Sequence, residues 1–312
     1  MQKSPPRTAI LDCDPGTDDA LAILLALASP ELHLAAITVA GGNAPLARTL
    51  ANACGLVALG AATVPVHAGA ARALLAPYPP GWPGHGADGM AGVPLPAGPA
   101  PAPTLAADAI RALLRAAPAP LTLIGIGPAT NLALALATEP PLAANVEEIV
   151  LMSGALGAGN ATPAAEFNAW CDPEALAIVL AAGPPVTLAT LETGRAAPAT
   201  PARIAALRAR AAAARPGRGR AAATAAAILA ALPSPRRGAP GSPLYDPCAL
   251  AWLIAPVLFA ARPAAVSLDL GPGPSRGRTS IDLRETARAR VLDLLDPDGL
   301  FTLLGGRLAR LP

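Results

Sequence analysis

The chain has 312 residues, a formal net charge of +2 and 53% hydrophobic residues. This composition allows a large buried core and excludes a chain that is disordered throughout. The small net charge argues against a nucleic-acid or membrane-surface partner, because both depend on a concentrated basic field. No apolar run reaches membrane-spanning length, and the polar, proline-containing start lacks a signal-peptide core. We therefore expect a cytoplasmic protein, in which the well-separated Cys13, Cys54, Cys171 and Cys248 are free thiols.

Short apolar runs alternate with helix-like stretches along much of the chain. The pattern predicts strands at 9–11, 35–39, 121–124, 149–152 and 186–189, and helices at 17–28, 45–60 and 129–137. Such alternation is typical of an α/β fold with a mainly parallel (Rossmann-like) central sheet and helices on both faces. We expect one domain over residues 1–312, with its active site at the carboxyl ends of the strands.

Two segments depart from this alternation. Residues 77–103 are crowded with Pro and Gly and are too long for an idle connection, so they are a candidate active-site loop or lid. Residues 198–240 are rich in Ala and Arg and predict helices broken at Pro216-Gly217 and at Pro233-Ser234-Pro235. The arginines of this segment are interpreted as solvated helix faces, since no aromatic residue lies among them to stack on RNA bases.

The densest chemical signal is a group of four carboxylates within eight residues: Asp12, Asp14, Asp18 and Asp19. They lie at the end of a predicted strand and the start of a predicted helix. Acids this close repel one another unless a cation compensates them, and oxygen ligands suit Ca²⁺ or Mg²⁺. Helix capping explains one or two of these acids but not Asp12 and Asp14 within the strand end.

The segment from Asp12 to Ala20 resembles the DxDxGxDDA signature of the inosine–uridine-preferring nucleoside hydrolase family. Further segments match in order between Ile10 and Phe259. They are Gly41-Gly42-Asn43, Gly84 to Gly89, Ile126 to Asn131, Leu151 to Gly154, Gly159-Asn160, Glu166 to Asn168, and Asp246-Pro247. The resemblance implies an enzyme that hydrolyses the N-glycosidic bond of ribonucleosides to ribose and free base, and that assembles as a homodimer or homotetramer.

The resemblance also implies roles for individual residues. Ca²⁺ would be held by Asp14, Asp19, Asp246 and the backbone carbonyl of Thr130, and Asp14 would deprotonate the attacking water. The sugar would contact Asp18, Asn43, Met152, Asn160, Glu166 and Asn168, and Asp12 would support the metal site. Taken singly, several of these residues have simpler interpretations: Asn43 and Asp246 as helix caps, Met152 as core, and Glu166 and Asn168 as an ordinary polar loop.

The sequence departs from the family pattern where the base would leave. The residue before the last metal-ligand aspartate is often His and helps protonate the base; here it is Tyr245, a poorer acid near neutral pH. Tyr245 then either stacks on the base or donates a hydrogen bond, or the acid is His85 in the Gly-rich segment. His85 as an uninvolved loop residue is an equal alternative. The Thr-His of the family is replaced by Thr193-Gly194-Arg195, which weakens assignment to a subgroup. The region before Tyr245, which in relatives can supply base-stacking aromatics, is rich in alanine here, so the preferred base stays open.

Two other functions compete with the hydrolase interpretation. A haloacid-dehalogenase-type phosphatase also places DxD at a strand end, but it needs Thr or Val four residues after the first Asp, where Gly16 lies. The second alternative is a nucleoside- or ribose-binding protein that has lost efficient turnover, which Tyr245 motivates. The complete set of predicted metal ligands argues against that alternative.

Overall fold

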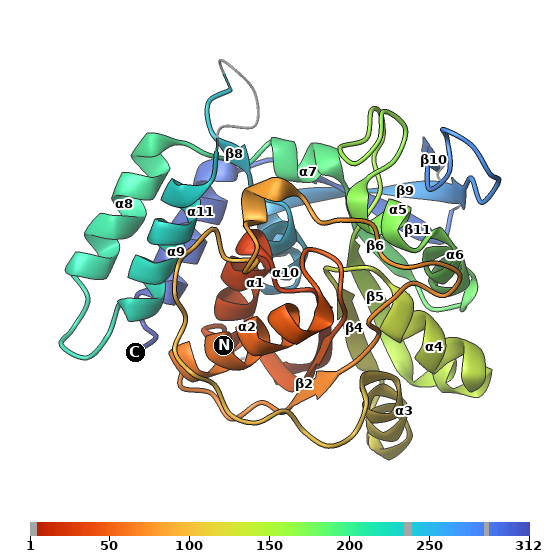
Figure 1. The fold of residues 1–312 in the computed structure, drawn as a ribbon, viewed down its shortest axis with the longest axis horizontal. Helices are drawn as coiled ribbons and strands as arrows, with labels where there is room; N and C mark the ends of the chain where they lie inside the picture. The colour runs from red at the N-terminus through yellow and green to blue at the C-terminus, as the bar shows by residue number, and fades with distance from the viewer. Residues whose placement is uncertain (1–4, 234–238, 284–286) are drawn as a thin grey trace.

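The structure is a computed structural model, and it describes residues 5–233, 239–283 and 287–312. Within these residues a nine-stranded sheet runs through the molecule in the order β10-β9-β11-β6-β5-β4-β1-β2-β3 (Figure 1). The strands are β1 (Arg7–Cys13), β2 (Leu32–Val39), β3 (Val66–Ala68), β4 (Leu121–Gly125), β5 (Val146–Met152), β6 (Val186–Ala189), β9 (Phe259–Leu268), β10 (Thr279–Leu283) and β11 (Ala289–Leu294). In the order of the sheet, the seven strands β11-β6-β5-β4-β1-β2-β3 are parallel to one another. Strand β9 is antiparallel to both of its neighbours, β10 and β11.

Helices cover both faces of this sheet. Side chains on one face pack against α1 (Thr17–Leu27), α2 (Leu46–Leu59), α9 (Arg220–Ala231), α10 (Asp246–Ile254) and α11 (Pro297–Leu308). Those on the other face pack against α3 (Ala106–Ala116), α4 (Thr130–Thr138) and α6 (Pro173–Ala181). The alternation of side chains along a strand separates the two cores, as in β1, where Leu11 and Cys13 face the first and Ile10 faces the second. The predicted fold class is confirmed.

Each strand and helix predicted from the alternation is present, with bounds that differ by at most a few residues. The prediction missed the C-terminal strands β9, β10 and β11, which extend the sheet beyond β6. In β9 the alanines and Pro263 blur the alternation that normally marks a half-buried strand. No helix among the described residues is long and apolar enough to cross a membrane, and Cys13, Cys54, Cys171 and Cys248 are buried and free.

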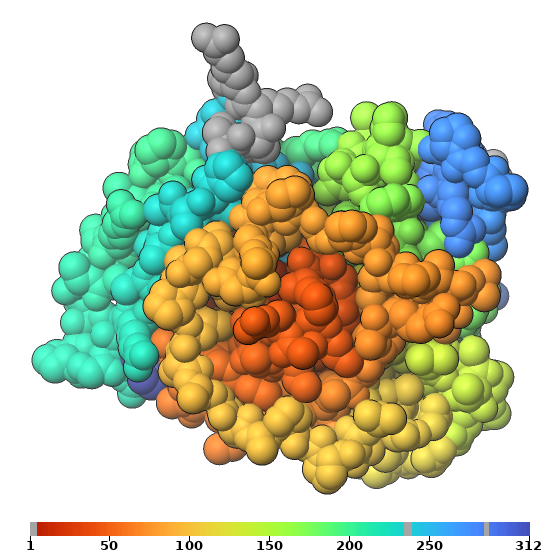
Figure 2. Space-filling model, in the orientation of Figure 1, coloured from red at the N-terminus to blue at the C-terminus, as the bar shows by residue number. Residues whose placement is uncertain are grey.

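The two irregular segments lie on the outside of the sheet. Residues 77–103 form an orange-to-yellow band that borders the exposed side of α2 (Figure 2), and their only helical turn within the described chain is η1 (Pro83–His85). Residues 198–240 contain α8 (Pro201–Ala212) and α9, separated around Pro216-Gly217 as predicted. The predicted break at Pro233 lies just beyond the end of α9, and its Ser234 and Pro235 lie outside the described residues.

Candidate active site at the carboxyl ends of the parallel strands

The predicted site residues follow the carboxyl ends of neighbouring parallel strands. Asp14 comes directly after β1, Asn43 comes after β2, and Thr130 begins α4 after β4. Met152 is the last residue of β5, and Asp246 is the first residue of α10. Because parallel strands end at the same edge of a sheet, the residues that end or follow β1, β2, β4 and β5 are brought to one rim. Asp246 does not follow a strand of this sheet, and α10 places it beside Asp18 and Asp19.

Asp14 lies in a cradle that only glycine permits. A Cβ on Gly42 would lie 2.1 Å from Oδ2 of Asp14, and a Cβ on Gly127 would lie 2.5 Å from Oδ1. Oδ2 accepts the backbone N–H of Asn43 at 2.8 Å. Oδ1 is buried and has no hydrogen-bond partner, which leaves it as an acceptor for a cation or a water.

Three further carboxylates lie beside each other. One oxygen from each of Asp18, Asp19 and Asp246 lies within 4.8 Å of the others. Burial, followed by the charge of Asp18, raises the pKa of Asp19 from 3.8 to about 7. Burial and then the neighbouring acids also raise the pKa of Asp14 and of Asp246 well above the usual range. A compensating divalent cation fits this oxygen-rich set. Asp18 belongs to the acidic cluster that predicted a cation, although the family resemblance implies a sugar contact for it.

The simpler interpretations of Asn43 and Asp246 as helix caps are not observed. Helix α2 begins after Pro45, and α10 begins at Asp246 itself without a side-chain cap. The amide of Asn43 instead donates to Oδ2 of Asp19 at 3.0 Å and to the carbonyl of Asp14 at 3.2 Å. Asp19 does serve α1 as well, because its Oδ2 accepts the N–H of Gly16 at 2.9 Å. Asn43 therefore joins the two carboxylates.

Asp12 is held by two side chains that the sequence analysis did not single out. Its Oδ1 accepts the hydroxyl of Thr38 at 2.6 Å and the amide of Asn131 at 2.8 Å, whereas Oδ2 is buried without a partner. Burial raises the pKa of Asp12 to about 7, against the lowering effect of these two bonds. The sequence held two signs of these partners: Thr38 is the polar residue of the apolar run 35–39, and Asn131 ends the segment that begins at Ile126.

Thr130 lies at the centre of a chain of hydrogen bonds from the 77–103 segment to the start of α6. The phenol of Tyr78 donates to Oγ1 of Thr130 at 2.7 Å, and Thr130 donates to Oδ2 of Asp172, also at 2.7 Å. Asp172 is buried and caps α6 through the N–H of Ala175. Tyr78 and Asp172 were both missed, since nothing in the sequence indicates that they meet.

The predicted sugar contacts on the far side of the site form one short loop and helix. Glu166 caps α5 (Phe167–Cys171) by accepting the N–H groups of Asn168 and Ala169. Its Oε2 also accepts from Gly154 N at 3.0 Å and Ser153 Oγ at 3.3 Å.

Two side-chain amides, of Asn160 and Asn168, hold this loop and helix in place. The amide of Asn168 donates to the carbonyls of Ile126 and Met152 at 3.0 and 3.1 Å. The amide oxygen of Asn160 accepts the N–H of Phe167 at 2.9 Å. Asn168 therefore joins this helix to two parallel strands.

The two candidate leaving-group residues lie on different elements. His85 is buried in η1, and its Nδ1 accepts the N–H of Thr17 at 3.2 Å, so it reaches the start of α1 from the 77–103 segment. Burial lowers its pKa below 6.5. Burial raises the pKa of Tyr245 to about 12, with a lowering effect of Arg195 and raising effects of Asp18 and Glu166. By contrast, His33 is exposed, and His67 bonds the carbonyl of Thr104 at 2.9 Å.

Comparison with known proteins gives a consistent result over nearly the whole chain. The family model described as inosine-uridine preferring nucleoside hydrolase matches residues 9–302. A pyrimidine-specific ribonucleoside hydrolase RihA from Shewanella woodyi is 39% identical, over 97% of this chain and 98% of the relative.

Solved structures agree with this result. A purine-preferring ribonucleoside hydrolase from Gardnerella vaginalis has a TM-score of 0.87 at 29% identity, over 97% of this chain and 98% of its own. An inosine-guanosine nucleoside hydrolase has a TM-score of 0.88 at 28% identity, over 98% and 99%. The chain is thus a ribonucleoside hydrolase, an N-glycosidase, and it belongs to the inosine-uridine preferring nucleoside hydrolase family.

Proposed function

We propose that this ribonucleoside hydrolase prefers pyrimidine ribonucleosides. The observation that carries the proposal is the environment of the two candidate leaving-group residues: His85 is buried and Tyr245 is half-buried, which disfavours the charged form of each side chain. The lowered pKa of His85 and the raised pKa of Tyr245 leave both side chains neutral near pH 7. Neutral imidazole and phenol donate hydrogen bonds but are poor proton donors. A departing pyrimidine carries its charge onto the carbonyl oxygen beside the glycosidic nitrogen, which a hydrogen bond stabilises, whereas a purine needs a proton on its ring.

The tautomer of His85 supports this role. Nδ1 lies 3.2 Å from the backbone N and 2.9 Å from Oγ1 of Thr17. We assign the proton of the neutral ring to Nε2, so that Nδ1 accepts from Thr17 and Nε2–H is the donor to the base. The similarity to relatives named pyrimidine-specific, at 37–39% identity, points to the same class of substrate. The purine-preferring enzyme of known structure is less similar, at 29% identity.

Asp14 is proposed as the general base. Its unpartnered Oδ1 accepts a proton from the water that attacks C1′ of the ribose. As the C1′–N bond breaks, its electron pair leaves with the base, and the water oxygen forms the new bond to C1′. The surrounding carboxylates stabilise the positive charge that develops on the sugar.

We propose Ca²⁺ as the cation of this site, held by Asp14, Asp19, Asp246 and the carbonyl of Thr130, with Asp12 supporting them. When bound, it supplies the positive charge that lowers the pKa of a nearby water and attracts the sugar hydroxyls. The adjacency of Asp18, Asp19 and Asp246 and the orphaned oxygens of Asp12 and Asp14 support a cation here.

The ribose is proposed to lie against Asp18, Asn43, Met152, Asn160, Glu166 and Asn168. Asn160 uses its amide oxygen for the N–H of Phe167, which leaves its NH₂ group for a sugar hydroxyl. Oε1 of Glu166 accepts one hydrogen bond, so a lone pair remains for the sugar. Contacts of this kind reject substrates that lack a hydroxyl, because the enzyme's buried polar group then loses its partner.

A cytoplasmic location and a homo-oligomeric assembly complete the proposal. Four buried free thiols support a cytoplasmic location, where thiols stay reduced. The homodimer or homotetramer remains a prediction from the family resemblance, and light scattering on the purified protein measures it directly.

The test is ribose release from uridine, cytidine, inosine, adenosine and nitrophenyl riboside, with and without a calcium chelator. We expect kcat/KM for uridine and cytidine to exceed that for the purine ribosides at least about tenfold, and chelation to abolish all activity. Equal rates on uridine and inosine would contradict the pyrimidine preference. Full activity in the chelator would contradict the role of calcium.

A further inference from the structure

Helix α7 (Leu191–Arg195) holds the loop that follows β5 (Figure 1). Oε2 of Glu192 accepts the N–H of Leu156 at 2.8 Å, and Nη2 of Arg195 donates to the carbonyl of Ala158 at 3.1 Å. The same Nη2 lies 3.5 Å from the carbonyl of Gly159, next to Asn160. Nη1 of Arg195 bonds Oε1 of Glu192 at 3.1 Å. One ion pair therefore secures two points of the loop that leads to Asn160.

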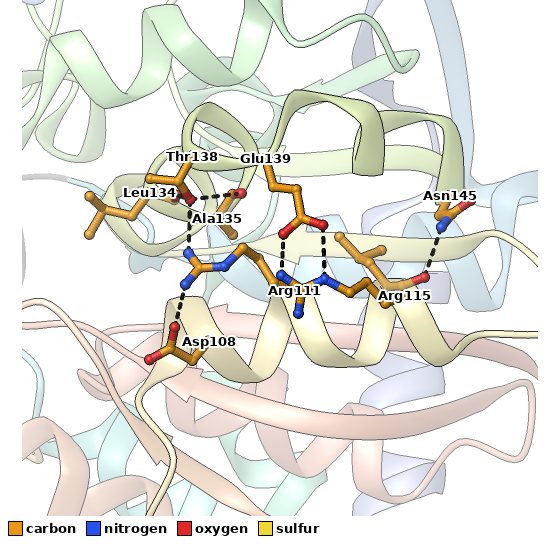
Figure 3. Close-up of polar contacts among 9 residues, drawn as sticks. Asp108, Arg111, Arg115, Leu134, Ala135, Thr138, Glu139 and Asn145 are labelled. Carbon is orange, nitrogen blue, oxygen red and sulfur yellow. Dashed lines mark hydrogen bonds and ion pairs between the residues drawn. The ribbon is translucent and has the colours of Figure 1, made fainter.

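This ion pair differs from an ordinary surface pair because both of its side chains also bond to the backbone of the loop. The side chains of Arg195 and Glu192 are 35% and 31% exposed, and an exposed pair alone contributes little to stability. Arg115 of α3 and Glu139, which follows α4, form such a pair (Figure 3). Arg195 and Glu192, in contrast, each add a hydrogen bond to loop backbone.

The ring of Tyr245 packs against Gly194, which has no side chain. A Cβ on Gly194 would lie 2.1 Å from Cδ1 of Tyr245, 2.9 Å from Cε1 and 3.0 Å from Cα. The ring thus packs directly on the backbone of α7, where any larger residue would displace it. Arg195 is the next residue of α7, so its guanidinium belongs to the same short helix on which the ring of Tyr245 packs. Gly194-Arg195 and Tyr245, the two departures from the family pattern, therefore meet in one structural unit.

We propose that Gly194 and Arg195 position Tyr245 for the departing base, with Arg195 also holding the loop of Asn160. Gly194 provides the space for the ring, and the guanidinium, by donating to the phenol oxygen, polarises the O–H toward the base carbonyl. Arg195 is thus a positioning residue that acts through Tyr245. The inference rests on the proposed role of Tyr245 as a hydrogen-bond donor to the leaving base.

The kinetic test is a double-mutant cycle of Arg195→Met and Tyr245→Phe. Arg195→Met keeps most of the side-chain length and removes the charge. We expect it to lower kcat on uridine about tenfold, with a smaller change in KM, and to lower kcat on nitrophenyl riboside less than about threefold. In the Tyr245→Phe background, Arg195→Met should have little further effect on uridine. The matched control is Arg115→Met, which should leave kcat on both substrates unchanged.

A second readout does not depend on activity. The chain has two tyrosines, so 3-fluorotyrosine labelling gives two ¹⁹F signals, which Tyr245→Phe assigns. Arg195→Met and Gly194→Ala should move the Tyr245 signal and leave that of Tyr78 in place, whereas Arg115→Met should move neither.

The outcomes separate this inference from the proposed function. The positioning role would be overturned if Arg195→Met left the ¹⁹F signal of Tyr245 unmoved. It would also be overturned if Arg195→Met lowered kcat on uridine equally in the wild-type and Tyr245→Phe backgrounds. Failure of the wild-type enzyme to hydrolyse uridine would count against the proposed pyrimidine preference alone. In that case the ¹⁹F comparison decides whether Arg195 holds Tyr245.

Discussion

The buried carboxylates predict that the stability of the metal-free enzyme falls as the pH rises. The folded-state pKa of Asp19 is about 7, against 3.8 for the exposed group. Below pH 4 both states hold the proton, and above pH 7 both have lost it. Between these values the folded state binds more protons than the unfolded state, so the free energy of unfolding decreases with pH.

The size of the effect follows from the pKa difference. A full proton of difference corresponds to about 1.4 kcal/mol per pH unit, and the difference falls to about half a proton at pH 7, where folded Asp19 is half ionised. Asp19 alone therefore lowers the free energy of unfolding by about 2.3 kcal/mol between pH 5 and pH 7. An unfolding entropy of about 2.1 cal/mol/K per residue over 312 residues converts this into a Tm decrease of roughly 3.5 °C. Bound calcium replaces the protons as the compensating charge, so calcium should stabilise the enzyme more at pH 8 than at pH 5.

Thermal unfolding in chelator, followed from pH 5 to pH 8, measures this effect. The variant Asp19→Asn removes the titrating group and should show a shallower decrease in Tm than the wild type. Asp108→Asn is the matched control, because Asp108 is an exposed acid on α3 paired with Arg111 (Figure 3); it should keep the wild-type slope. Identical slopes for the wild type and Asp19→Asn would refute the reasoning.

Four further predictions concern single changes. Asp14→Asn should lower kcat on uridine by at least about 10³-fold, because base and cation ligand are lost together; a loss below tenfold would rule out that role. The wild type should prefer uridine over 2′-deoxyuridine by about 10⁴ in kcat/KM, and similar values would show that the 2′ hydroxyl is not recognised. Tyr78→Phe removes the 2.7 Å bond to Thr130 and should cost about 1 kcal/mol of stability and weaken calcium binding in calorimetry; unchanged affinity would separate Tyr78 from the metal site. Tyr245→His should raise activity on inosine more than on nitrophenyl riboside, whose leaving group needs no proton, and an equal effect on both would disconnect residue 245 from the base.

The fold was predictable wherever one local pattern was decisive. Buried parallel strands are continuous apolar runs, so residues 121–124 and 186–189 were identified directly and match β4 and β6. The edge strand β10 and its neighbour β9 were missed because they are partly exposed, and alanine satisfies both buried and exposed positions. Their pairing also depends on contacts distant in sequence, which no local pattern carries.

The site was predictable to the extent that its residues are close in sequence or follow strand ends. Asp12, Asp14, Asp18 and Asp19 fall within eight residues, and the rule for parallel sheets brings Asn43 and Thr130 to the same rim. The sequence by itself therefore determined the α/β class, the acidic cluster and the family resemblance.

Only the tertiary structure decided which partners surround these groups. It joined Tyr78 to Asp172 through Thr130, replaced the capping interpretation of Asn43 by bonds to two carboxylates, and packed Tyr245 on Gly194. The physical reason is that a hydrogen bond depends on distances of a few ångströms between residues far apart in sequence. Tyr78 and Thr130 are separated by 52 residues, and Asp12 and Asn131 by 119. Burial of the carboxylates, which sets their pKa values, likewise arises only when the helices close over the sheet.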